Sequence, residues 1–91
     1  MKKGVHAFVV GQVQGVGFRY YVHRVARRYM LSGWVRNLVD GQVEIMVEGD
    51  ENELGHFIDE VKKGSRWSHV DDVKVEWVDY QNQFRSFEIT G

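Results

Sequence analysis

The sequence predicts an α+β domain in which two helices cover one face of an antiparallel sheet. Three observations support this class. The hydrophobic pattern switches between a period of two and a helical period, glycine-bearing turns fall where the period changes, and 43% of the 91 residues are hydrophobic. That share is enough for one buried core and the length is that of one domain, so we assign residues 1–91 to a single domain.

The first half of the chain is expected to form a strand, a helix and a second strand. Residues 5–12 are β-branched and apolar, as is typical of a strand. Apolar residues then recur at the helical spacing i, i+3, i+4, i+7, as Val22, Val25, Ala26 and Tyr29. We expect this helix to end near Met30, and residues 34–38 predict the second strand.

The second half repeats this order around a hairpin. Asp40-Gly41 is a strong hairpin signal, and the alternation of apolar and polar residues over 43–48 predicts the next strand. Asp50 and Glu53 have the spacing of a capping box for a second helix. The apolar stripe of that helix is Leu54, Phe57, Ile58 and Val61. Alternation over 73–77 predicts a fourth strand, and residues 84–89 predict a short additional one.

The resulting order, β-α-β-β-α-β, is that of the ferredoxin-like sandwich. We therefore expect a four-stranded antiparallel sheet, a short fifth strand and two helices on one face. In such a split βαβ unit the first two strands run parallel with a third between them, so their C-terminal ends lie at the same edge of the sheet.

Composition excludes several functional classes. The chain has no cysteine, so it has no disulfide, thiolate metal site or cysteine nucleophile. The net charge of −1 does not favour a nucleic-acid partner. The apolar run over 7–10 is too short for a secretory signal or a membrane span, so we expect a cytoplasmic protein. The four histidines lie in different segments with no metal-ligand spacing, so no metal is expected.

Residues 11–19 carry the clearest chemical signal, because this glycine-bearing turn leads from a strand into a helix. The first N–H groups of a helix lack intrahelical partners, and the helix dipole adds positive charge there. Glycines let such N–H groups converge into a nest that binds an anion, and Arg19 adds a guanidinium that can hold two phosphate oxygens. From these residues alone, a glycine turn beside a solvated arginine remains an alternative.

Asn37 lies near the end of the second predicted strand. An asparagine before a turn usually bonds to its own backbone. The predicted parallel strands favour a functional role for Asn37. Two strand spacings place it roughly 10 Å from the loop that ends the first strand. A phosphate held by that loop would lie within reach of the Asn37 side chain.

At these residues the sequence resembles the acylphosphatases. The first signature of that family, roughly V-x-G-x-V-Q-G-V-x-F-R, is matched by Val9, Gly11, Val13, Gln14, Gly15, Val16, Phe18 and Arg19. The second, roughly G-W-V-R/K-N-x-x-x-G-x-V-x-x-x-x-x-G, is matched by Gly33, Trp34, Val35, Arg36, Asn37, Gly41, Val43 and Gly49. The likeness runs from about His6 to Val78.

The resemblance implies the ferredoxin-like fold and the hydrolysis of acyl phosphates to a carboxylate and inorganic phosphate. It implies that Arg19 and Asn37 are catalytic. It also implies a phosphate-binding loop made of Gln14, Gly15, Val16, Gly17, Phe18 and Arg19. We expect a monomer without metal or cofactor. Two departures concern loops only: Gly49-Asp50 stands where the family often has Gly-Pro, and residues 64–67 lack the family's frequent prolines.

A ferredoxin-like module that binds an anion or RNA without catalysis is the main alternative. The strand over 43–48 is acidic and lacks a stacking aromatic residue, which argues against RNA. An acylphosphatase-like domain of a larger carbamoyl-transfer enzyme is a further alternative. We also expect Phe18 and Tyr20 to pack under the loop, and Trp67 to be exposed beside the substrate.

Overall fold

The structure, a computed structural model, describes residues 1–91 and contains five strands and two helices. In chain order the elements are β1 (Lys2–Gln12), α1 (Phe18–Arg28), β2 (Ser32–Asn37), β3 (Val43–Asp50), α2 (Glu51–Lys63), β4 (His69–Val78) and β5 (Phe87–Thr90). Neither helix is long and apolar enough to cross a membrane.

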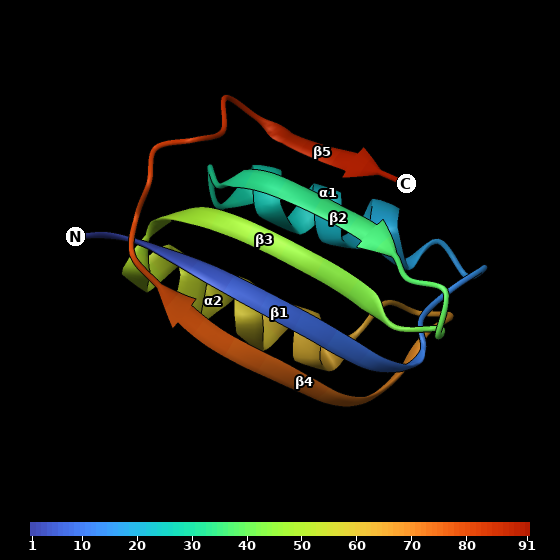
Figure 1. Ribbon diagram of the computed structural model, residues 1–91. Helices are drawn as coiled ribbons and strands as arrows, with labels where there is room; N and C mark the ends of the chain where they lie inside the picture. The colour runs from blue at the N-terminus through green and yellow to red at the C-terminus, as the bar shows by residue number, and fades with distance from the viewer.

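The strands form one sheet in the order β4-β1-β3-β2-β5, and both helices lie on the same face of it (Figure 1). This is the predicted ferredoxin-like fold. The sheet is mixed rather than wholly antiparallel, because β5 pairs parallel with β2 whereas the other neighbours are antiparallel. After β4 the chain crosses the end of the sheet to its opposite edge, so β5 starts at the same end as β2 and runs in the same direction (Figure 1).

The core lies between the sheet and the helices, where the predicted apolar positions meet. Along β1, Val5, Ala7 and Val9 are buried because alternate residues of a strand face the same side. The buried residues of α1 are Phe18, Val22, Val25 and Ala26, and those of α2 are Leu54, Phe57, Ile58 and Val61. Both predicted stripes are confirmed, with Tyr29 only partly buried against the core.

The connection from β4 to β5 is held by a carboxylate that sequence analysis did not identify. Glu48 on β3 is only 1% exposed, and it accepts hydrogen bonds from Gln81 N at 2.7 Å and Gln83 N at 3.2 Å. A charged acceptor strengthens such bonds. Glu48 thus fixes the crossing segment that brings β5 to the edge of β2.

A second buried carboxylate ties three strands together on the face without helices. Glu44 of β3 accepts hydrogen bonds from Arg36 of β2 at 2.7 Å and contacts His6 Nε2 of β1 at 2.6 Å. Burial alone would raise the pKa of Glu44, but the hydrogen bonds from His6 and Arg36, together with their charges, hold it below its ordinary value. The β1–α1 loop and the β2–β3 hairpin lie at the right-hand ends of these strands in Figure 1.

The lowered pKa of Glu44 predicts how its contribution to stability depends on pH. A carboxyl whose pKa is lower in the folded state stabilises the fold above its unfolded pKa and loses that contribution as pH falls through the folded pKa. We expect the wild type to exceed Glu44→Gln in unfolding free energy at pH 6, and the gap to narrow as the pH falls below about 4. Urea denaturation across this pH range measures the difference in unfolding free energy between the two proteins. A difference that grows toward acid pH would contradict the lowered pKa of Glu44.

Candidate active site

The loop between β1 and α1 takes a conformation that its glycines make possible. Gly15 and Gly17 have φ of 73° and 76°, in the left-handed region that other residues enter only at a cost. A Cβ atom at either position would meet no atom within 4 Å, so the requirement for glycine is conformational rather than steric. Gly17 is the N-cap of α1, and no side chain caps this helix.

The N–H groups from Gly15 to Tyr20 donate to no acceptor within the protein. The first hydrogen bond of the helix is made by Tyr21 N, which donates to Gly17 O at 3.1 Å. The first turn of α1 contains no acidic residue. At α2, by contrast, Asp50 accepts from Asn52 N at 2.9 Å, and Glu51 and Glu53 lie in the first turn. Only α1 therefore presents an uncompensated positive end.

Arg19 adds a full positive charge to this end of α1. Its guanidinium forms no ion pair with any carboxylate of the protein. It lines a cavity of about 110 Å³, together with Val13, Gly15, Gly17, Phe18, Tyr20 and Asn37. No acidic side chain lines this cavity, which therefore suits a small anion such as phosphate.

Asn37, the last residue of β2, lines the same cavity. Its Oδ1 is buried and has no hydrogen-bond partner. An unpaired buried oxygen is rare in proteins, because its desolvation costs free energy that no bond returns. The predicted meeting of Arg19 and Asn37 is thus present, with β3 between the two parallel strands that carry the loop and the asparagine.

Gln14 holds the loop against the β2–β3 hairpin. Its side-chain amide donates to Leu38 O at 2.7 Å and to Gln42 O at 2.9 Å. Gln14 and Val16, both assigned to the phosphate loop from the sequence, are not among the residues that line the cavity, and Val16 packs against the core. The Gln14 side chain therefore sets the distance between the loop and the hairpin next to Asn37.

The two aromatic residues at the start of α1 have different environments. Phe18 is 1% exposed under the loop, as predicted. Tyr20 is 71% exposed, so the prediction that it packs under the loop is wrong. Successive helical residues are about 100° apart, so Tyr20 lies about 200° around the axis from Phe18. Trp67 is also 71% exposed, but it does not line the cavity.

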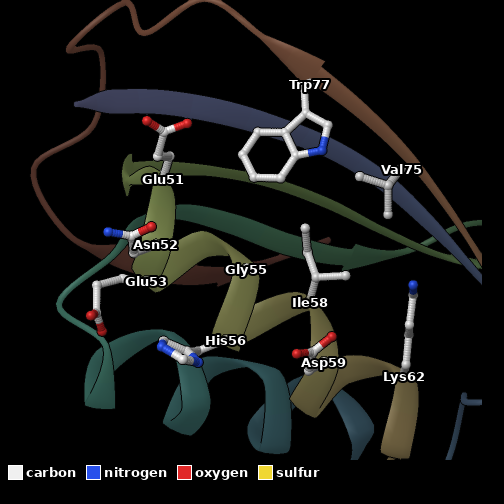
Figure 2. Close-up of a pocket in the computed structure, with 10 residues that line it drawn as sticks. All are labelled: Glu51, Asn52, Glu53, Gly55, His56, Ile58, Asp59, Lys62, Val75 and Trp77. Carbon is white, nitrogen blue, oxygen red and sulfur yellow. The ribbon is translucent and has the colours of Figure 1, made fainter.

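A larger groove of about 810 Å³ lies between α2 and β4, where Trp77 stands over the helix (Figure 2). Its lining includes Glu51, Glu53 and Asp59. These carboxylates repel an anion. The small cavity at α1 is therefore a better candidate for an anionic substrate than this groove, despite its size. No three His, Asp or Glu side chains lie close enough together to form a metal site.

Comparison with known proteins identifies the family of the chain. The acylphosphatase family model matches residues 5–89. The chain belongs to the acylphosphatase family. An acylphosphatase from Caldanaerobacter subterraneus subsp. tengcongensis is 44% identical over 89 residues, which cover 98% of this chain and 99% of that one. Membership identifies an enzyme with acylphosphatase activity.

Solved acylphosphatase structures share the fold. The crystal structure of acylphosphatase from Bacillus subtilis superposes with a TM-score of 0.94 at 43% identity, and each chain is covered completely. The chain also matches 12% of full-length HypF, in its phosphate- and nucleotide-bound form, with a TM-score of 0.87 at 32% identity. An acylphosphatase-like unit therefore also occurs within a much longer protein.

The left-handed conformation of Gly17 gives a test of the loop. We expect Gly17→Ala to lower the free energy of unfolding by about 1–2 kcal/mol, since an L-residue is strained at this φ. Gly55, inside α2, is the matched control, because its Cβ would also meet nothing within 4 Å. Gly55→Ala should stabilise the protein by about 0.5–1 kcal/mol. Urea denaturation compares the two, and equal effects would show that the loop conformation is not as described.

Proposed function

We propose that the cavity at the start of α1 hydrolyses acyl phosphates by positioning and charge stabilisation alone. The N–H groups of residues 15–20 and the Arg19 guanidinium bind the phosphoryl group. Asn37 orients the attacking water. No metal, cofactor or phospho-enzyme takes part in this mechanism.

One observation carries the proposal: three unsatisfied features converge on a single cavity. These are the free N–H groups of the loop, the guanidinium of Arg19, which has no carboxylate partner, and the side chain of Asn37, whose Oδ1 has no hydrogen-bond partner. The N–H groups and the guanidinium are donors suited to a phosphoryl group, and the Asn37 side chain lines the same cavity. Such a set is costly to maintain in a folded protein unless a ligand completes it.

Hydrolysis of an acyl phosphate needs few catalytic groups beyond these donors and a positioned water. The leaving group is a carboxylate whose conjugate acid has a pKa of about 4, close to that of Glu. It departs as an anion, so no general acid is required. Phosphoryl transfer passes through a loose transition state in which charge gathers on the phosphoryl oxygens. Preorganised N–H groups and Arg19 stabilise that charge without rearranging.

Asn37 acts on the water rather than on the phosphate. Its side-chain amide hydrogen-bonds to the water and holds it so that a lone pair of the water oxygen points toward phosphorus. A side-chain amide is not basic at neutral pH, so it does not remove the proton. A phosphate oxygen of the substrate accepts the proton as the new P–O bond forms and the P–O bond to the acyl group breaks.

The assignment is tested by phosphate release from benzoyl phosphate in the presence of EDTA. We expect turnover by the wild type and a loss of about 100-fold or more in kcat/KM for both Arg19→Gln and Asn37→Ala. Circular dichroism and urea denaturation should show both variants folded. Persistent turnover by either variant would remove that residue from the mechanism.

Two matched variants control for loss of charge and loss of an amide elsewhere. Arg27→Gln removes an arginine of the same helix that lies outside the cavity, and Asn52→Ala removes an exposed asparagine of α2. Both should keep wild-type turnover. A folded wild type that binds phosphate but releases none from benzoyl phosphate would favour a non-catalytic anion-binding module instead.

A further inference from the structure

The size of the cavity limits how much of a substrate it encloses. Its volume is about 110 Å³, against about 810 Å³ for the groove between α2 and β4. In the proposed function the loop N–H groups and Arg19 hold the phosphoryl group inside it. The acyl part of an acyl phosphate then extends away from these groups, toward the exposed residues that line the cavity.

The rim residue that offers apolar area is Tyr20. It lines the same cavity as Arg19 and Asn37, yet 71% of its surface is exposed. Its hydroxyl makes no hydrogen bond, and its ring stacks on no aromatic or cationic side chain of the protein, whereas Tyr21 beside it contacts both Phe18 and Arg24. The face of the Tyr20 ring is thus free at the mouth of the phosphate site.

The other lining residues cannot take this role. Val13 and Phe18 are each 1% exposed, so they form the floor of the cavity. Gly15 and Gly17 have no side chain. Arg19 and Asn37 are committed to the phosphoryl group and the water in the proposed function.

We infer that Tyr20 binds the acyl group of the substrate and favours acyl phosphates with a planar or extended apolar acyl group over acetyl phosphate. This inference rests on the proposed function, since it takes the phosphoryl position from it. A ring against an aromatic or apolar group gains from burial and from offset stacking, and acetyl phosphate offers only a methyl group for such contact. The hydroxyl of Tyr20 plays no part.

The test compares kcat/KM for benzoyl phosphate and acetyl phosphate in the wild type, Tyr20→Ala, Tyr20→Phe and Trp67→Ala. We expect Tyr20→Ala to lose about two- to tenfold on benzoyl phosphate, through KM, and to stay within about twofold on acetyl phosphate. Tyr20→Phe should match the wild type, because it keeps the ring. Trp67→Ala, which removes an equally exposed aromatic residue outside the cavity, should affect neither substrate.

An equal loss on both substrates, no loss on either, or a selective loss with Trp67→Ala would overturn the inference. A binding measurement separates it from failure of the proposed function. Phenylphosphonate and methylphosphonate carry the same anionic head and are not hydrolysed in this way. Tyr20→Ala should weaken phenylphosphonate relative to methylphosphonate by about two- to tenfold, even in an enzyme without turnover, and an unchanged affinity ratio would contradict the inference.

Discussion

Six consecutive backbone N–H groups, from Gly15 to Tyr20, have no acceptor in the protein, and the site is built around this deficit. A helix start usually finds a side-chain cap or an acidic residue, as α2 does with Asp50. Leaving α1 without either keeps its positive end available to a ligand. Arg19 then adds charge of the same sign, which no carboxylate of the protein neutralises.

The fold supplies what keeps such a loop in place. Phe18 is buried directly beneath it, and the Gln14 amide bonds the loop to the hairpin that follows Asn37. Glu44 ties together β1, β3 and β2, the strands that carry the loop and Asn37. The loop and Asn37 are therefore held by packing and by hydrogen bonds made elsewhere, as the proposed mechanism of positioning requires.

The amino-acid sequence predicted the features that depend on periodicity and on local motifs. The two helix stripes, the hairpin, the cap at Asp50 and the shared cavity of Arg19 and Asn37 all follow from spacing and strand direction. The parallel pairing of β5 was not predicted, because Glu48 fixes the preceding segment through contacts 33 and 35 residues away. The exposure of Tyr20 could have been predicted from the sequence, because its angle from Phe18 around α1 places it off the buried stripe.

The most direct test of the site is to determine which residues bind phosphate. Titration of the ¹⁵N-labelled protein with inorganic phosphate should shift the amide signals of residues 15–20 and the Arg19 side chain at the lowest phosphate concentrations. A groove elsewhere on the surface, whose charged lining residues are Lys2, Arg27, Arg85 and Glu88, provides an internal comparison. If its signals saturate first, or if those of residues 15–20 do not move, the unsatisfied N–H groups are not the phosphate site and the proposed mechanism is wrong.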